Sequence, residues 1–323
     1  MKTNAIRIHQ TGGPEVLKFE EIDLADLRPG EIRVRNKAVG LNFIETYFRS
    51  GLYSVPLPFT LGSEAAGVVD AVGEGVTNVK VGDRVAYNSG GAYAELTNVP
   101  AARALPLPAG VSDEAAACLL LKGATAEYLL RRTFRVEKGQ TILWHAAAGG
   151  VGLIATQWAK HLGCTVIGTV GSDDKIAIAK AHGCDHIINY RTENTVERVK
   201  EITGGKKVPV VYDGVGKDTF MTSLDCLAPR GLLVSFGNAS GPVTGVDLGI
   251  LAAKGSLYVT RPTLATYAAS PKDYAEIGAE VFDVVAKGAV KIEINQRYKL
   301  ADAAQAHRDL EARKTTGATV LVP

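Results

Sequence analysis

Residues 145–153 read HAAAGGVGL and decide the fold of this chain. A run of strand-forming residues precedes them and a run with helical spacing follows, so the glycines lie in a turn between a strand and a helix. Gly149 and Gly150 let the backbone approach a pyrophosphate, whose charge the free amides of a helix N-terminus stabilise, and Gly152 lets the helix pack close to the sheet. Ala147 stands where the G-x-G-x-x-G pattern has its first glycine. We therefore predict a dinucleotide-binding turn from this context as well as from the glycines.

Strands and helices alternate regularly along the sequence around this turn. Short apolar strands separated by helices are typical of a parallel sheet that is covered on both faces. Six strands make up the sheet of a complete dinucleotide-binding fold. We predict an α/β protein with a Rossmann-type, doubly wound parallel sheet, with strands at 141–146, 165–170, 186–189, 208–213, 231–236 and 256–260 and helices at 151–162, 175–182, 195–202 and 219–227.

The sequence on either side of this alternation has a different texture. The first third contains short β-type runs between glycines and prolines, which predicts a mostly β, barrel-like domain. A nucleotide domain inserted into a β domain that resumes at the C-terminus explains this order, with boundaries at 1–123, 124–262 and 263–323. Elsewhere in the chain we expect strands at 5–9, 31–41, 64–72, 83–86 and 318–322, an extended connection at 100–110, helices at 113–121, 125–134, 271–287 and 301–313, and Ser112 as an N-cap.

Charge and cysteine usage limit the classes of partner and compartment. The chain of 323 residues has 36 Lys and Arg against 34 Asp and Glu, so its formal net charge is +2 and nothing favours a nucleic acid or a membrane surface as partner. No apolar stretch approaches the roughly 20 residues of a membrane span. The four cysteines are widely spaced, which favours buried reduced thiols and a cytoplasmic location. None of the six histidines pairs with a cysteine at a ligand spacing, so we expect no metal site and structural roles for all of them.

The end of the predicted second strand bears on the choice of dinucleotide. An NAD site usually has an acidic residue there, which binds the ribose 2′-hydroxyl. Here the strand ends in Gly171 and Ser172, and the first acidic residues, Asp173 and Asp174, come late. Lys175 could neutralise a 2′-phosphate and Ser172 could donate a hydrogen bond to it, so we predict NADPH in preference to NADH. The same polar residues could also simply cap the following helix, and the two interpretations are compatible.

Several further stretches carry a resemblance to a known family. They are GGPEVL (12–17), GLNF (40–43), GSEAAG (62–67), VGDRV (81–85), AAAGGVG (146–152), SFGN (235–238) and VTRP (259–262). With them the chain resembles, over effectively its whole length, the quinone oxidoreductases of the medium-chain dehydrogenase/reductase superfamily, which include the ζ-crystallins. The resemblance implies a GroES-like β-rich catalytic domain beside the Rossmann domain, NADPH as cofactor, a quinone as acceptor and a homodimer formed through an edge strand. Zinc-dependent relatives have a cysteine where Asn42 stands and a histidine where Ser63 stands, which agrees with the expected lack of a metal site.

The resemblance also implies the residues of the site. Tyr47 and Tyr53 match the aromatic positions that line the substrate cleft, and Asn42 would hydrogen-bond the nicotinamide ribose or the substrate oxygen. These three are the candidate catalytic residues, with ordinary packing under a loop as the alternative for the tyrosines. Arg261, at the end of the sixth predicted strand, could contact the cofactor or could only pair with a carboxylate. The candidate cofactor-binding residues are Asn42, Thr125, Gly149, Gly150, Val151, Gly171, Ser172, Lys175, Tyr190, Phe236, Gly237, Asn238, Thr260, Arg261 and Arg313.

The chemistry expected of such a site is transfer of a hydride from nicotinamide C4 to an electron-poor acceptor, with the protein orienting the cofactor. A quinone suits a site without a metal because its carbonyls are already activated. Reduction of an activated C=C bond in an enal or enone is the alternative activity. A binding role, to AU-rich RNA or as a crystallin-like structural protein, is the alternative from another class, and the balanced charge argues against RNA. The sequence shows no general acid, so the proton could come from solvent or from a tyrosine.

Overall fold

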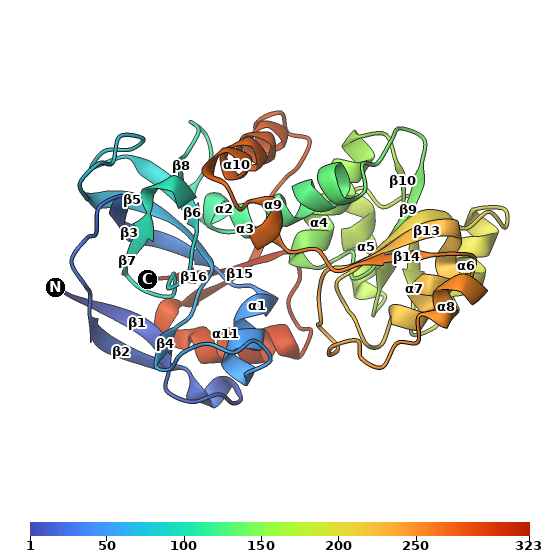
Figure 1. Cartoon of the computed structure of the whole chain (residues 1–323), viewed down its shortest axis with the longest axis horizontal. Helices are drawn as coiled ribbons and strands as arrows, with labels where there is room; N and C mark the ends of the chain where they lie inside the picture. The colour runs from blue at the N-terminus through green and yellow to red at the C-terminus, as the bar shows by residue number, and fades with distance from the viewer. The chain divides into compact units, whose positions relative to one another are not determined.

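The structure is a computed structural model that describes residues 1–323 in two compact units (Figure 1). The β-rich unit consists of Met1–Lys122, Ser270–Ala286 and Ile292–Pro323. The α/β unit consists of Gly123–Ala269 and Lys287–Lys291. The C-terminal segment of the chain therefore belongs to the same unit as the N-terminal segment. Every helix is too short or too polar to cross a membrane.

Two sheets form the β-rich unit. One has three antiparallel strands in the order β2-β1-β4, and the other has seven strands in the order β15-β16-β3-β5-β6-β8, with β7 paired to β3. The last strand of the chain lies antiparallel to β3 and pairs Val320 with Gly40. The strands are β1 (Lys2–Ile8), β2 (Lys18–Asp23), β3 (Glu31–Gly40), β4 (Phe59–Thr60), β5 (Glu64–Val72), β6 (Arg84–Asn88), β7 (Leu96–Pro100), β8 (Ala104–Pro106), β15 (Ile294–Lys299) and β16 (Ala318–Val322).

Apolar side chains on one face of these strands form the core of the β-rich unit. Ile32 and Val34, two residues apart on β3, are both fully buried, as the period of a strand requires. The Ser112 hydroxyl accepts the amide of Ala115 at 3.2 Å, which confirms the predicted N-cap. The boundary between the two units falls within α3 (Leu120–Tyr128). The other helices of the β-rich unit are α1 (Phe43–Ser50), α2 (Asp113–Ala117), α10 (Pro271–Ala286) and α11 (Ala303–Glu311).

A single parallel sheet of six strands forms the centre of the α/β unit. Its order is β11-β10-β9-β12-β13-β14, so successive strands are added on one side of β9 first and on the other side afterwards. Ligands of such sheets bind beyond the carboxyl ends of the strands, at the point where the order reverses, which here lies between β9 and β12. The strands are β9 (Thr141–Trp144), β10 (Thr165–Val170), β11 (His186–Asn189), β12 (Val208–Asp213), β13 (Leu227–Ser235) and β14 (Tyr258–Thr260).

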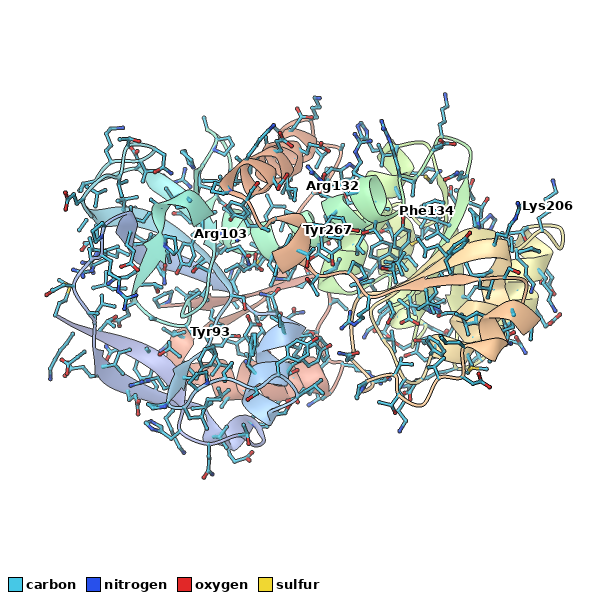
Figure 2. All side chains as sticks on the ribbon, in the orientation of Figure 1. Tyr93, Arg103, Arg132, Phe134, Lys206 and Tyr267 are labelled. Atoms are coloured by element: carbon cyan, nitrogen blue, oxygen red, sulfur yellow. The ribbon has the colours of Figure 1, made fainter.

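Helices connect these strands and pack against the sheet (Figure 1). Tyr267, labelled in Figure 2, stacks on Tyr128 with ring centroids 4.8 Å apart and so joins α9 to α3. The predicted α/β class, with a doubly wound parallel sheet and a separate β-rich part, is confirmed. The helices are α4 (Gly150–His161), α5 (Asp174–Ala181), α6 (Thr195–Ile202), α7 (Phe220–Cys226), α8 (Gly249–Ala253) and α9 (Leu264–Tyr267), and a π-helical turn covers Leu129–Thr133.

Some predicted bounds are wrong for local backbone reasons. β9 ends at Trp144, before the predicted residue 146, because Ala146 takes a left-handed conformation with φ +54°. The break between the predicted helices 113–121 and 125–134 comes earlier than expected. Cys118 is the C-cap of α2, and α3 already begins at Leu120. A 3-10 turn at Ala101–Arg103 interrupts the predicted extended connection. The elements that the sequence analysis did not predict are β2, β4, β7, β8, β15, α1, α8 and α9, although β8 lies within the predicted extended connection.

All four cysteines are buried and free of disulfide bonds. This confirms the prediction of buried reduced thiols. Burial raises the pKa of Cys118 to about 12, so this thiol stays protonated at neutral pH.

Candidate cofactor and substrate site

The turn predicted from HAAAGGVGL lies between β9 and α4, as expected. Gly149 is the N-cap of α4, with φ −82° and ψ 170°, and Ala146 turns the chain with its left-handed backbone. A Cβ on Gly152 would stand 2.5 Å from the carbonyl oxygen of Ala146, which is closer than side chains come, so this approach requires glycine. The first amides of a helix have no partner within it and can bind an anion. The strand–turn–helix context that the motif requires is therefore confirmed.

A buried hydrogen-bond network holds the beginning of this turn. His145 Nδ1 lies 2.9 Å from the Thr169 hydroxyl, and His145 Nε2 lies 3.0 Å from the Ser223 hydroxyl. Ser223 donates its own proton to Asp213 Oδ2 at 2.7 Å, so Nε2 of His145 is the donor to Ser223 and Nδ1 accepts from Thr169. Burial lowers the pKa of His145, although the charge of Asp213 opposes the shift. The imidazole is therefore neutral with both nitrogens paired.

Asp213 extends this network to the loop after β12. Its Oδ1 accepts the amides of Val215 and Gly216 at 2.8 and 3.0 Å, and both its oxygens accept from the Thr219 hydroxyl. The network thus joins the carboxyl ends of β9, β10 and β12 where the strand order reverses. Sequence reasoning missed its members other than His145, for which it expected a structural role. Polar residues near the ends of predicted apolar strands, such as Asp213, are the signal that could have found them.

The end of β10 carries no carboxylate, as the sequence analysis expected of an NADPH site. Ser172 and Lys175 are half-buried there, and the Lys175 amide donates to the Ser172 carbonyl at 3.2 Å. Asp173 makes no side-chain cap to α5, and its Oδ1 instead accepts from Asn189 Nδ2 at 2.7 Å. The alternative prediction, that these residues cap the helix, is therefore wrong for the Asp173 side chain, whose carboxylate is bound at the end of β11. Asp173 is still the N-cap residue, and Asp174 lies in the first turn of α5, where the helix dipole favours an acidic residue.

Gly171 and Tyr190 lie at the neighbouring ends of β10 and β11. The amide of Tyr190 donates to the carbonyl of Val170 at 3.1 Å, which fixes the two strand ends side by side. The Tyr190 side chain is 40% exposed. The structure thus brings Gly171 and Tyr190 together with Ser172 and Lys175, the residues predicted for the 2′-phosphate.

Most of the other predicted cofactor residues of the α/β unit lie at the carboxyl ends of β13 and β14, on the other side of β9 from β10 and β11. Phe236, Gly237 and Asn238 follow β13, and Thr260 ends β14. Arg261 links the two strand ends, since its Nη1 donates to the carbonyl of Ser235 at 2.9 Å. Thr125 lies on α3, and Val151 lies in the first turn of α4 beside Gly150.

The predicted residues of the β-rich unit gather around α1, with one exception. Asn42 is the N-cap of α1, Tyr47 lies on the helix, and the Tyr53 amide donates to the Tyr47 carbonyl at 3.1 Å. The rings of Tyr47 and Tyr53 meet edge to face, with centroids 5.3 Å apart, and both side chains are half-buried. Arg313 is the exception, because it follows α11, where it is exposed and has a left-handed φ of +60°.

Three buried charged residues surround Asn42, and sequence reasoning missed all of them. Glu64 Oε1 accepts from Lys122 Nζ at 2.8 Å and from Asn42 Nδ2 at 3.1 Å, and Glu64 Oε2 accepts the amide of Leu121 at 2.7 Å. Glu45 Oε2 accepts the backbone amide of Asn42 at 2.8 Å. The spacing N-x-x-E of residues 42–45, which is typical of a capping box, is the signal that could have found Glu45.

For both Glu45 and Lys122, burial and the neighbouring opposite charge shift the pKa in opposite directions. Burial raises the pKa of Glu45 to about 7, helped by the charge of Glu64 and opposed by the Ser63 hydroxyl and by Lys122. Burial alone would lower the pKa of Lys122, but the Glu64 carboxylate raises it above the usual value. Lys122 therefore remains an ammonium ion, and Glu45 is the carboxyl group that can hold a proton near neutral pH.

Comparisons with known proteins agree with this geometry. Two family models match the chain, the alcohol dehydrogenase GroES-like domain at residues 28–109 and the zinc-binding dehydrogenase at residues 150–280. The chain is 59% identical to a quinone oxidoreductase of Pseudomonas aeruginosa, with 97% of each chain covered. It belongs to the quinone oxidoreductase family.

Two further proteins, a quinone oxidoreductase and a 2-haloacrylate reductase, are similar to the chain. The structure of the quinone oxidoreductase of Escherichia coli complexed with NADPH matches it with a TM-score of 0.97 at 54% identity, covering 99% of this chain and 100% of that one. A 2-haloacrylate reductase of a Burkholderia species is 44% identical, with 98% of each chain covered. The medium-chain dehydrogenase/reductase architecture of the quinone oxidoreductases thus extends over the whole chain.

The residues around Asn42 do not fit the zinc ion that one of the matching model descriptions names. Glu64 Oε1 already accepts from the Lys122 ammonium and from the Asn42 amide, so a zinc ion would have to share this oxygen with a cation. Zinc also needs several Cys, His or carboxylate ligands converging on one point. No three His, Cys, Asp or Glu side chains of this quinone oxidoreductase are grouped so that they could hold a metal ion.

Proposed function

We propose that this chain is an NADPH-dependent quinone oxidoreductase that works without zinc. The observation that carries the proposal is the match, over 99% of the chain, to a quinone oxidoreductase structure complexed with NADPH. The phosphate-binding turn and the uncharged end of β10 agree with that cofactor. NADPH, when bound, supplies the hydride from C4 of its nicotinamide, and the protein orients the two reactants.

The turn before α4 and the end of β10 would hold the phosphates of NADPH. Gly150 and Val151 offer the first amides of α4 to the pyrophosphate. The amide of Gly149 donates to the Ala146 carbonyl at 2.9 Å, so Gly149 would contribute by letting the backbone approach the pyrophosphate. Ser172 and Lys175 would bind the 2′-phosphate, and Tyr190 would lie beside it. A lysine ammonium is a compact charge that favours a phosphate over a ribose hydroxyl. The remaining proposed cofactor contacts are Asn42, Thr125, Gly171, Phe236, Gly237, Asn238, Thr260, Arg261 and Arg313.

Asn42, Tyr47 and Tyr53 are the proposed residues of the reaction itself. The two phenol rings have an apolar body and a polar tip, so they can stack on a quinone or donate hydrogen bonds to it. The proposed domain boundaries are 1–123 and 263–323 for the catalytic domain, which includes both ends of the chain, and 124–262 for the NADPH-binding domain.

A steady-state screen of acceptors tests the activity. Purified protein is assayed with 1,4-naphthoquinone, a 2-alkenal and 2-haloacrylate, each with NADPH and with NADH. We expect the highest kcat/KM for the quinone with NADPH. A value for either alkene more than tenfold above that for the quinone would overturn the quinone assignment, and equal use of NADH would overturn the cofactor assignment.

Reduction of an activated C=C bond is the second candidate activity. The 44% identity to a 2-haloacrylate reductase favours it, although the identity to quinone oxidoreductases is higher. Both reactions move a hydride from the same cofactor to an electron-poor carbon or oxygen, so the same screen separates them.

A homodimer formed through β14 completes the proposal. β14 is an edge strand that pairs only with β13, and its Tyr258 is 62% exposed beside the exposed Val259. An exposed apolar edge strand is a template for pairing with a second copy. Light scattering should give twice the 34.1 kDa of the chain, and Val259→Lys should reduce the mass towards one chain. The four buried thiols support a cytoplasmic location for this dimer.

A further inference from the structure

Glu64 fixes the orientation of the Asn42 amide. Its two oxygens accept three hydrogen bonds, from Lys122, Asn42 and the Leu121 amide, so Glu64 is the acceptor towards Asn42. Nδ2 of Asn42, and not Oδ1, must therefore face Glu64. The second hydrogen of Nδ2 points to the Gly40 carbonyl at 3.4 Å. Since both hydrogens are used inside the protein, Oδ1 is the polar atom that the Asn42 side chain can offer to a ligand.

Glu45 fixes the backbone of the same residue. It is fully buried, its Oε2 accepts the Asn42 amide in the capping box of α1, and its Oε1 has no hydrogen bond of normal geometry, although the Ser63 hydroxyl lies near the carboxyl group. A buried carboxylate with an unpaired oxygen is costly, and more so beside the charge of Glu64, so the protonated form is favoured. The raised pKa of Glu45, about 7, agrees with this assignment. A carbonyl oxygen has two lone pairs, so Oδ1 of Asn42 can cap the helix and still accept from a ligand.

The proton on Glu45 balances the charge of the cluster. Two carboxyl groups, Glu45 and Glu64, lie near a single ammonium, Lys122, and all three side chains are buried. With one proton on Glu45 the cluster is neutral, whereas without it a buried negative charge would remain. Asn42 is therefore held by neutral surroundings, and its free oxygen acts as a simple hydrogen-bond acceptor.

We propose that Glu45, Glu64 and Lys122 are positioning residues, which hold Asn42 so that it presents Oδ1 to a hydroxyl group of the bound cofactor. The inference rests on the proposed function, because it assumes that Asn42 contacts NADPH. It decides between the two partners considered for Asn42. A quinone carbonyl is itself an acceptor and cannot hydrogen-bond Oδ1, whereas a ribose hydroxyl donates to it in both redox states of the cofactor.

The binding of NADPH, followed by protein fluorescence, tests this inference without quinone turnover. The double variant Glu64→Gln/Lys122→Met removes the buried ion pair without leaving a lone charge and lets the Asn42 amide rotate. We expect its Kd for NADPH to rise about tenfold, the loss of one well-oriented hydrogen bond. In an Asn42→Ala background the same two substitutions should add nothing, since they act through Asn42. Glu114→Gln/Arg297→Met removes an exposed ion pair and should leave the Kd unchanged.

A second pair of variants keeps the test decisive if the buried double variant does not fold. The amide oxygen of Glu45→Gln can still accept from the Asn42 backbone, so NADPH binding should stay within about twofold of wild type, whereas Glu45→Leu should weaken it about tenfold. The inference is overturned if Glu45→Leu binds NADPH like wild type. It is also overturned if the double variant loses as much affinity in the Asn42→Ala background as alone. A wild-type protein that binds NADPH but reduces no quinone would refute the proposed activity, while these binding measurements would still decide the positioning role.

Discussion

The hydroxyl group of Tyr190 occupies the space that a Cβ on Gly171 would need. Gly171 follows β10 and Tyr190 follows β11, so the two residues close one edge of the proposed 2′-phosphate site. The close approach, and not a left-handed backbone, requires glycine at this position. Because the Tyr190 side chain is partly exposed, it can move away at little cost in folding free energy.

Gly171→Ala should therefore affect cofactor binding more than stability. Displacing Tyr190 removes its contact with the cofactor, so we expect the Kd for NADPH to rise about tenfold, which corresponds to about 1.4 kcal/mol of binding free energy, with the melting temperature almost unchanged. Gly90→Ala is the control, because a Cβ on Gly90 meets nothing within 4 Å. Fluorescence titration gives the Kd values. Wild-type affinity in Gly171→Ala would mean that Tyr190 makes no contact with the cofactor.

Lys175→Ala should weaken NADPH much more than NADH. Lys175 lies in the first turn of α5 and would pair with the 2′-phosphate, which NADH lacks. A charge-assisted hydrogen bond contributes about 1.5–3 kcal/mol, so we expect a loss of roughly 10- to 100-fold for NADPH. Lys180→Ala, in the last turn of the same helix, is the control for a change of net charge. Equal losses for the two cofactors would exclude Lys175 from the 2′-phosphate site.

The parallel sheet was predictable because its strands are mostly apolar and the sequence of the turn after β9 is typical of dinucleotide binding. β10, β11 and β12 begin and end where the sequence analysis placed them. The end of β9 was not predictable, since only the packed structure forces Ala146 into a left-handed conformation. β15 was missed because its residues are half-buried and exposed in turn and polar ones dominate, so no apolar pattern marks it as a strand.

The candidate site was predictable where a motif identifies it and not where buried charges build it. α1 buries Glu45, Thr46 and Arg49, so its inner face shows no apolar periodicity. Its N-cap Asn42 and its C-terminal Gly51 were the readable signals of a helix. Lys122 lies in an apolar run, and its pairing with a glutamate that is 58 positions away becomes visible only in the folded chain.

His307 should make the protein less stable as the pH falls. It lies 3.1 Å from Arg49 Nη1, which can only donate, so His307 Nδ1 accepts and Nε2 donates to the Tyr93 hydroxyl at 3.2 Å (Figure 2 labels Tyr93). Burial, with the charge of Arg49, lowers the pKa of His307 from 6.5 to about 3. The unfolded chain takes up this proton near pH 6.5 and the folded chain only near pH 3. Stability is therefore lost through this window as the pH falls, by about 1.4 kcal/mol per unit.

Urea unfolding at pH 7 and pH 5 measures this contribution. We expect His307→Gln to lose about 2 kcal/mol less than wild type between the two pH values, because glutamine does not titrate. Glutamine also offers an oxygen to Arg49 and an amide to Tyr93, so the fold should be kept. His161→Gln, at an exposed position, should retain the wild-type pH dependence. The same pH dependence in His307→Gln and wild type would contradict the burial argument.

Glu45 should make the protein less stable as the pH rises, which is the opposite of the effect of His307. Its pKa is about 7 in the folded chain and 4.5, the usual value of a glutamate, in the unfolded chain. The folded chain therefore keeps a proton that the unfolded chain releases. The contribution of this group is fully present below pH 4.5 and is lost as the pH rises to about 7, by roughly 3 kcal/mol in all. We expect Glu45→Gln to lose less stability than wild type between pH 5 and pH 7.5 in urea unfolding. Glu276→Gln, exposed on α10, is the control, and an identical loss in Glu45→Gln and wild type would show that Glu45 is ionised throughout.

Tyr53 should be required for the acceptor and not for the cofactor. Its ring meets the rings of Tyr47 and Phe48 edge to face, at 5.3 and 5.8 Å, while its backbone amide is bound independently of the side chain. Tyr53→Ala should therefore keep the loop and raise the KM for 1,4-naphthoquinone about tenfold, since aromatic contacts contribute roughly 0.5–1.5 kcal/mol beyond area burial. The Kd for NADPH should not change. Tyr53→Phe, which keeps the ring, separates stacking from hydrogen bonding by the hydroxyl. A lower melting temperature with an unchanged KM would make Tyr53 a packing residue of α1.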